Sequence, residues 1–172
     1  FLDVKFAIDF QESAPGPEGF DTICFLISMN PGQPLMPLQK VASGGELSRV
    51  MLAIKTVLAD KDAVGTMIFD EIDVGISGRT AQKVSEKMAV IARSRQVICI
   101  THLPQIAAMA DQHFEIRKSA SDGRTATSIR ALDRESMVDE LARLLGGAEI
   151  TETVRQNAEE MKKLAKKRKL EV

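Results

Sequence analysis

A short apolar run that ends in two adjacent carboxylates constrains this chain more than any other feature of its sequence. Residues 66–69 are Thr-Met-Ile-Phe, and Asp70 and Glu71 follow directly. The run predicts a buried strand, and the acids then lie where open α/β sheets bind their ligands. In such a place one carboxylate can hold Mg²⁺ while the other acts on water, as in metal–phosphate sites.

The phosphate-binding part of such a site is missing from the sequence. The chain contains no G-x-x-x-x-G-K-[ST] loop and no Gly-Lys dipeptide. The sequence therefore predicts one part of a nucleotide-hydrolysing site and lacks another part.

The overall composition is that of a soluble globular chain that fits one domain. The 172 residues are 44% hydrophobic and 27% charged, and the net charge of −1 favours neither a nucleic-acid nor a membrane partner. No apolar stretch approaches the roughly 20 residues needed to span a bilayer. Cys24 and Cys99 are isolated in apolar runs, which predicts a reducing, cytoplasmic compartment. The chain begins without Met or a signal peptide, so we expect a fragment of a longer protein.

The hydrophobic pattern predicts strands that first pair locally and then alternate with helices. The predicted strands are 4–10, 22–29, 66–69 and 96–100, with a turn at 13–17, a loop at 30–37, and a hairpin of 114–116 and 125–131 around Asp122-Gly123. The predicted helices are 46–59, 79–93, one beginning at Pro104, one ending at Gly146-Gly147, and one from about Thr151. The first helix has an apolar face of Leu47, Val50, Met51, Ile54, Val57 and Leu58. This order predicts an α/β fold with a mixed sheet flanked by helices.

The string Ser43-Gly44-Gly45-Glu46 opens the first long helix and has two interpretations. It is a capping box, in which Ser43 and Glu46 bond reciprocally to each other's backbone amides. Two consecutive glycines exceed what a cap needs, and at a helix N-terminus they let an anionic ligand approach the backbone closely.

The acids after the first buried strand also have two interpretations. Acidic residues there are often plain solvated turn residues. Asp73, however, adds a third carboxylate within four positions, at the start of the glycine-punctuated loop 72–78. Three such acids repel one another unless a cation is bound, which favours a metal-dependent site.

His102 lies at a similar place, after the strand 96–100 and Thr101. A lone histidine is usually structural or exposed. If the two strands are parallel neighbours, however, His102 emerges beside Glu71 and can bond a terminal phosphate or its attacking water. His113 receives no functional assignment.

The basic residues after Arg155 have a plain explanation and a functional one. The terminal stretch of about 151–172 contains Lys162, Lys163 and the run 166–169. A solvated helix face is favoured over contacts with nucleic-acid phosphates, because no aromatic residue is interleaved to stack on bases.

Taken in order, Ser43–Glu46, the strand ending in Asp70-Glu71, and the strand ending in Thr101-His102 resemble the C-terminal lobe of ABC-type ATPases. Transporter members usually have Gln and Pro where this chain has Glu46 and Ile72, so residues 70–73 resemble the SMC branch, whose heads sit on coiled coils. Residues 42–49, 70–80 and 101–107 resemble, within that branch, the RecN family of bacterial DNA-repair proteins.

This resemblance implies that residues 1–172 are one C-terminal lobe of an ATPase head, without the N-terminal phosphate-loop lobe and the coiled coil. Two complete heads would then enclose two ATP molecules. Asp70 would orient Mg²⁺ through its water shell, Glu71 would polarise the attacking water, and His102 would hold the γ-phosphate. The motif Ser43-Gly44-Gly45-Glu46 would bind the ATP carried by the other head.

One position departs from the family pattern. Most ABC ATPases have Asp where this chain has Ser77, and Asp73 is expected to substitute for it in part, as a cofactor-binding residue. The function implied is ATP hydrolysis in DNA double-strand break repair and recombination, in a cytoplasmic, nucleoid-associated protein without a membrane partner. The alternatives are a transporter's nucleotide-binding lobe and a non-catalytic dimerisation or DNA-scaffold module.

Overall fold

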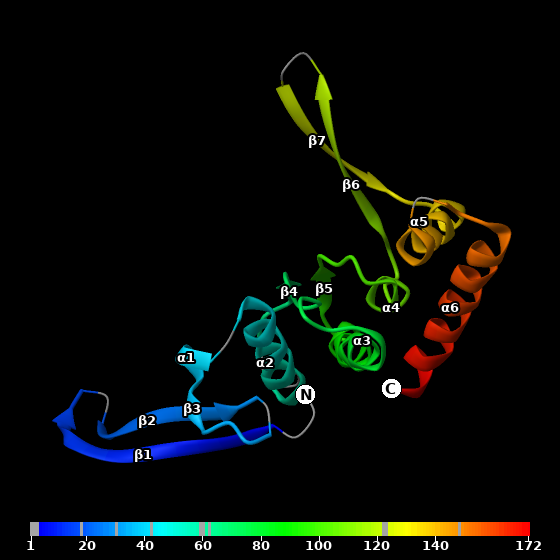
Figure 1. The fold of residues 1–172 in the computed structure, drawn as a ribbon. Helices are drawn as coiled ribbons and strands as arrows, with labels where there is room; N and C mark the ends of the chain where they lie inside the picture. The colour runs from blue at the N-terminus through cyan, green and yellow to red at the C-terminus, as the bar shows by residue number, and fades with distance from the viewer. Residues whose placement is uncertain are drawn as a thin grey trace.

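The computed structural model describes residues 4–17, 19–29, 31–41, 43–58, 61, 63–121, 124–147 and 149–172. A central body of strands and helices carries two hairpins that project from it in different directions (Figure 1). The α/β fold class predicted from the sequence is confirmed.

The first hairpin pairs β1 (Lys5–Gly16) with β2 (Gly19–Ser28), and a short β3 (Met36–Pro37) joins β2 before α1 (Leu38–Val41). The predicted turn at 13–17 is wrong, because β1 continues to Gly16. Residues 13–15 lie between paired positions where β2 has only Phe20, so a bulge absorbs Pro15, which has no backbone N–H to donate. The predicted loop 30–37 contains β3, and α1 follows it without having been predicted, because both elements are too short to leave a periodic pattern.

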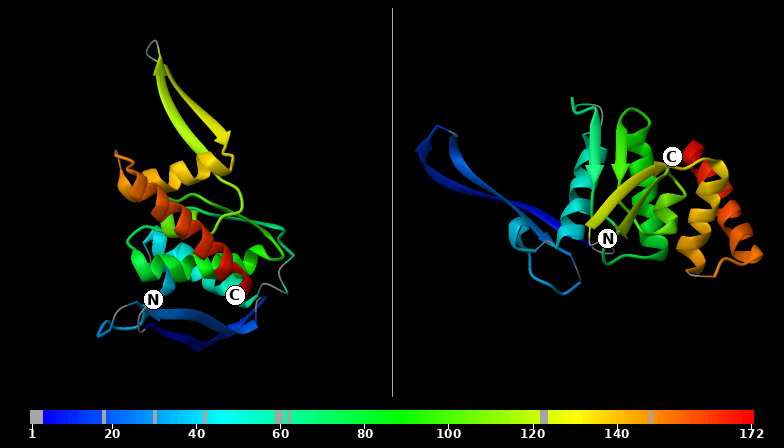
Figure 2. Two further views of the ribbon diagram at one scale, coloured as in Figure 1. Left: turned by 90° about the vertical axis from the view of Figure 1, so that its right-hand side faces the viewer. Right: turned by 90° about the horizontal axis from the view of Figure 1, so that it is seen from above.

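The central body consists of α2 (Gly44–Val57), β4 (Thr66–Phe69), α3 (Gly78–Ala92), β5 (Gln96–Cys99) and α4 (Pro104–Ala107). Each matches its predicted element to within two residues at every described end; the predicted end at Ala59 lies outside the described residues. One face of the β4–β5 pair packs against the helices, in a core formed by Leu52, Met67, Phe69, Ile72, Ala81, Val84, Met88, Ile91 and Ile106. Figure 2 shows α2 and α3 alongside these two strands.

The strands of the described residues divide among three sheets instead of one mixed sheet. Within the described part of the chain, β4 and β5 pair in parallel, and the two hairpins and β3 pair antiparallel. The second face of β4–β5 is bare: Ile68 is 67% exposed, and Ile98 and Ile100 are 44% and 50% exposed. Parallel sheets are normally covered on both faces, whereas the described residues leave this face of β4–β5 open.

The second hairpin, β6 (Phe114–Ser121) with β7 (Arg124–Ala131), confirms the predicted pairing. Its predicted turn, Asp122-Gly123, lies outside the described residues. The hairpin extends away from the body in both Figure 1 and Figure 2.

Two helices complete the chain: α5 (Arg134–Gly146) and α6 (Glu152–Glu171). Both predicted boundaries are confirmed, because Gly147 ends α5 with φ 72° and Thr151 caps α6. Small residues let the helices approach closely, since Ala142 and Ala158 are both fully buried in their shared core.

The basic residues of α6 serve partly to attach it to the body. Lys162 Nζ donates to the carbonyl oxygens of Ala108 and Ala110 at 3.1 and 2.6 Å. Arg168 pairs with Glu86 at 2.6 Å, and Lys169 pairs with Asp111. The predicted solvated face thus holds for Lys163, Lys166 and Lys167, which are exposed. Lys162, Arg168 and Lys169 instead contact the body. No helix among the described residues has the length and apolar character needed to cross a membrane.

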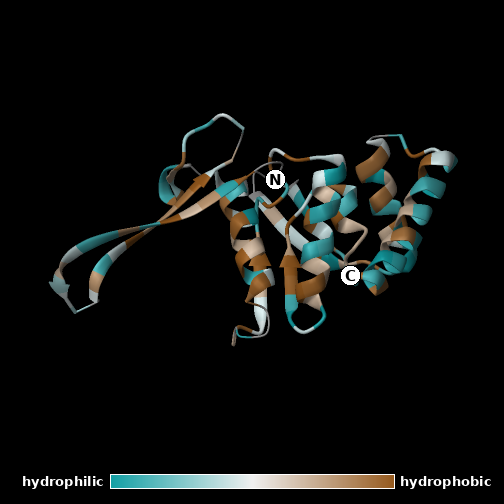
Figure 3. Cartoon of the chain, turned by 90° about the horizontal axis from the view of Figure 1, so that it is seen from below, coloured by the Kyte–Doolittle hydropathy of each residue, from teal (hydrophilic) through white to brown (hydrophobic). Residues whose placement is uncertain are grey.

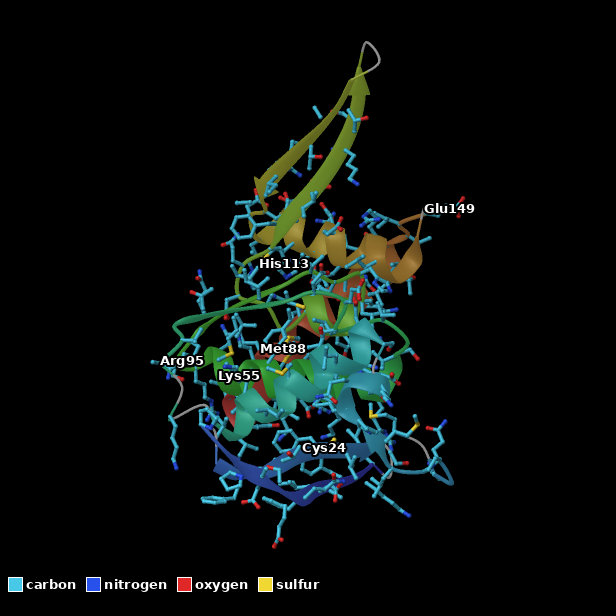
Figure 4. The ribbon with its side chains drawn as sticks, turned by 90° about the vertical axis from the view of Figure 1, so that its left-hand side faces the viewer. Cys24, Lys55, Met88, Arg95, His113 and Glu149 are labelled. Carbon is cyan, nitrogen blue, oxygen red and sulfur yellow. The ribbon has the colours of Figure 1, made fainter. Side chains whose placement is uncertain are left out.

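His113 is buried at the junction between the body and the second hairpin, whereas Met88 lies within the body (Figure 4). The Nε2 of His113 lies 2.8 Å from the carbonyl oxygen of Ala107. Burial, reinforced by the charge of Lys162, lowers the pKa of His113 below its usual 6.5.

This shift predicts a pH dependence of stability. As the pH falls through about 6.5, His113 binds a proton in the unfolded chain but stays neutral in the folded chain. The free energy of unfolding therefore decreases towards acid pH. The stability is thus fully present above pH 6.5 and is lost below it. Urea unfolding at a series of pH values measures this slope. His113→Gln should flatten it as the pH falls from neutral through 6.5, and an unchanged slope in that variant would contradict the assignment.

Candidate functional site

The parallel register of β4 and β5 brings the two predicted motifs to one edge. Phe69 pairs with Cys99, and the amide of Ile100 donates to the carbonyl oxygen of Phe69 at 3.0 Å. Asp70-Glu71 and Thr101-His102 therefore leave the sheet side by side, which confirms the condition set for His102 by the sequence analysis.

Asp70 is exposed and held by its backbone. Ser48, on the first turns of α2, donates its hydroxyl to the Asp70 carbonyl oxygen at 2.8 Å. The Asp70 carboxylate accepts the amide of Glu71 at 2.9 Å, which orients the carboxylate at the strand end.

Glu71 packs against the start of α2 in an unusual backbone conformation. Its φ is 57°, and among the described residues it is the only non-glycine with positive φ. A Cβ on Gly44 would overlap the Glu71 carboxylate, and a Cβ on Gly45 would lie 2.8 Å from the Glu71 carbonyl oxygen. The close approach of Glu71 thus accounts for the two consecutive glycines, which the capping box left unexplained.

The capping box itself is confirmed. Ser43 Oγ accepts the Glu46 amide at 3.4 Å, and the Glu46 carboxylate accepts the Ser43 amide at 3.1 Å. The Glu46 side chain is therefore engaged in the helix cap, while Ser43 and Gly44 are exposed.

Arg49 is a site residue that the sequence reasoning missed. It is buried, and its Nη1 donates to the carbonyl oxygens of Ile72 and Val74 at 3.1 and 2.9 Å. The guanidinium thereby fixes the loop after Glu71 against α2. The sequence offered one indication of this role. Arg49 precedes Val50 in α2, and both residues lie on the buried side of the helix.

Asp73 faces inward from this loop. Its side chain is 4% exposed, and Oδ2 accepts bonds from Thr101 Oγ1 at 2.6 Å and from the His102 amide at 2.9 Å. His102 Nδ1 lies 3.0 Å from the same oxygen, while the His102 side chain is 72% exposed. Burial opposes ionisation of Asp73, but the bonds from Thr101 and His102 outweigh it, so its pKa lies below the usual value.

The remaining titratable group at this edge is inert. Burial, together with the charges of Asp73 and Asp70, raises the pKa of the Cys99 thiol to about 12. Cys99 therefore stays protonated at neutral pH and is a poor nucleophile there.

The donor set at this edge fits a cation only in part. No group of three or more His, Cys, Asp or Glu side chains within the described part of the chain is placed to hold a metal ion. The exposed carboxylates of Asp70 and Glu71 supply the hard oxygen ligands that Mg²⁺ prefers. Such a set suits Mg²⁺ that takes its other ligands from water and phosphate.

Comparisons with known proteins identify relatives of the chain. No family model matches the chain. The chain is 53% identical over 146 residues to the DNA repair protein RecN of Treponema pallidum and 50% identical over 148 residues to that of Bacillus subtilis, matches that cover 85% and 86% of the chain. The chain is homologous to the C-terminal portion of RecN.

The chain spans only 26% of the length of each of these two RecN proteins. A solved structure from work on the structural biochemistry of ATP-driven dimerization and DNA-stimulated activation of SMC ATPases has a TM-score of 0.51 to the chain. That match covers 84% of each chain at 19% identity. It supports the fold of an SMC ATPase head.

The packing of this RecN-homologous edge predicts different outcomes for its two glycines. Gly45→Ala sets a Cβ against backbone, so it should destabilise the chain by about 1–3 kcal/mol. Gly44→Ala meets only the end of the Glu71 side chain, which can swing away, and should cost much less. Chemical denaturation of both variants measures the difference, and equal losses would refute the proposed packing.

Proposed function

We propose that this chain is the C-terminal lobe of an SMC-type ATPase head in a RecN-like DNA-repair protein. The observation that carries the proposal is the meeting of Asp70, Glu71 and His102 at one edge of β4–β5, next to the N-terminus of α2. Two exposed carboxylates and an exposed imidazole beside a helix N-terminus suit a phosphoryl-transfer site, where positioning and electrostatics do most of the work.

In this proposal the residues of the edge have separate roles. Asp70 would hold Mg²⁺ through its water shell, and the bound ion would neutralise charge on the phosphates. Glu71 would polarise the attacking water, and His102 would bond the γ-phosphate through its exposed ring. Ser43, Gly44 and Gly45 would bind the γ-phosphate of an ATP held by a second head, with Glu46 capping the helix that presents them.

The bare apolar faces support a missing N-terminal lobe as the intramolecular partner. Besides the β4–β5 face, the first hairpin exposes a row of aromatic and branched side chains on one side. These are Phe6, Ile8, Phe10, Ile23 and Phe25. Figure 3 shows apolar stretches along this hairpin, outside the helical body. Apolar surface of this extent calls for a covering partner, and the greater length of the relatives leaves room for one that carries the phosphate loop.

The biological role follows from the relatives, which are DNA repair proteins. We infer that the complete protein hydrolyses ATP in double-strand break repair and recombination, acts on DNA as a head dimer, and works in the cytoplasm at the nucleoid. A non-catalytic scaffold built on the same fold would dimerise without ATP.

The first test replaces the carboxylate assigned to water. In the complete protein, Glu71→Gln should retain ATP binding and slow hydrolysis by orders of magnitude, because the amide cannot accept the proton of the attacking water. Steady-state ATPase assays and nucleotide-binding titrations measure the two effects. The matched control is Glu149→Gln, the same change on an exposed residue remote from this edge (Figure 4), which should alter neither. Near-normal turnover in Glu71→Gln would overturn the assignment.

The second test uses residues 1–172 alone. Without a phosphate loop, the chain should bind ATP only weakly and hydrolyse essentially none, because a helix N-terminus and two carboxylates give too few contacts to a triphosphate. Isothermal titration with Mg²⁺ and ATP measures this affinity. A dissociation constant in the micromolar range, about −8 kcal/mol, would show that this edge binds nucleotide without the other lobe.

A further inference from the structure

Asp73 was expected to contact a cofactor, but its surroundings give it another task. Only 4% of the side chain is exposed, so no ligand at the open edge can reach the carboxylate directly. Two donors converge on one oxygen, Oδ2: the Thr101 hydroxyl and the His102 amide. The ring nitrogen Nδ1 of His102 lies 3.0 Å from the same oxygen. Both the amide and the ring nitrogen beside Oδ2 belong to His102.

The carboxylate is also fixed from behind. Arg49 donates to the carbonyl oxygens of Ile72 and Val74, the residues on either side of Asp73 in the chain. The Val74 amide donates to the Glu71 carbonyl oxygen at 3.0 Å, which closes the turn. The hydroxyl of Thr101, which donates to Asp73, also accepts the amide of Leu103 at 3.1 Å. Thr101 and Leu103, the residues on either side of His102, are therefore bonded to each other.

We propose that Asp73 is a positioning residue that turns the His102 ring so that Nδ1–H donates to the carboxylate and Nε2 faces the open edge. An ionised carboxylate accepts and never donates, so the nitrogen facing it must carry a proton. Nε2 is then the nitrogen available to a phosphate or water at the edge. The 72% exposure of the His102 side chain leaves that nitrogen accessible while its ring plane is restrained.

This inference rests on the proposed ATPase function only for its consequence in catalysis; the ring orientation can be tested without any activity. The experiment uses the complete protein with ¹⁵N-labelled histidine, in which long-range ¹H–¹⁵N NMR reports which ring nitrogen carries the proton. His102→Gln identifies the His102 signals. His113, whose Nε2 lies at the Ala107 carbonyl oxygen, serves as an internal marker of an intact fold.

The proposal predicts that neutral His102 carries its proton on Nδ1 in the unaltered protein. Asp73→Ala should shift the proton towards Nε2 while the His113 signals remain. The matched control is Asp70→Ala, which removes a nearby carboxylate that has no described bond to His102 and should leave the tautomer unchanged. Neutral His102 protonated on Nε2 in the unaltered protein would overturn the proposal, even if Asp73→Ala fails to fold.

A kinetic measurement then separates the inference from the proposed function. If the protein hydrolyses ATP, Asp73→Ala should lower kcat on the order of 10²-fold with KM for ATP little changed, because a misdirected imidazole costs orientation more than binding. If the unaltered protein is inactive, the proposed function fails, but the NMR result still decides the role of Asp73. Normal kcat in a variant with a shifted tautomer would show that the ring orientation does not matter to the reaction.

Discussion

The parallel pairing of β4 with β5 is the constraint on which the rest of the site depends. Four residue pairs in register set the ends of both strands at the same level, so the motifs that follow must share one edge. A slip of one residue would turn every side chain of a strand to the opposite face and expose Met67 and Phe69. The core between the strands and the helices therefore fixes the register. The register in turn places the residues that follow β4 and β5 at the same edge.

Contacts between the start of α2 and the loop after β4 fix the position of Glu71 at this edge. Ser48 and Arg49 bond the backbone on both sides of Glu71, and the absence of side chains at Gly44 and Gly45 lets Glu71 approach. The strained backbone of Glu71 persists because these neighbours over-determine it. The motif that would face a second head and the backbone of the residue that would act on water are thus packed against each other.

The uncovered faces accord with the proposal that this edge is one part of a larger active centre. A parallel sheet with one bare face and a hairpin with an aromatic row cannot be the final surface of a stable head. The lack of a covering partner also accounts for the exposure of α2. The helix buries Gly45, Arg49, Val50 and Leu52. The residues of its predicted apolar face that stay exposed are Leu47, Met51, Ile54 and Val57. That predicted face is the one that a further lobe would be expected to meet.

Local patterns in the sequence were enough to determine the elements of the central body, the caps of α2 and α6, and the identity of the residues at the strand ends. They succeeded because short apolar runs, capping residues and glycines act over a few neighbouring positions. The length of β1, the division into three sheets, the inward turn of Asp73 and the role of Arg49 depended on the tertiary structure. Each of these depends on contacts between residues distant in sequence, such as Asp73 with Thr101 or Arg49 with Ile72, and no local pattern encodes which partners meet.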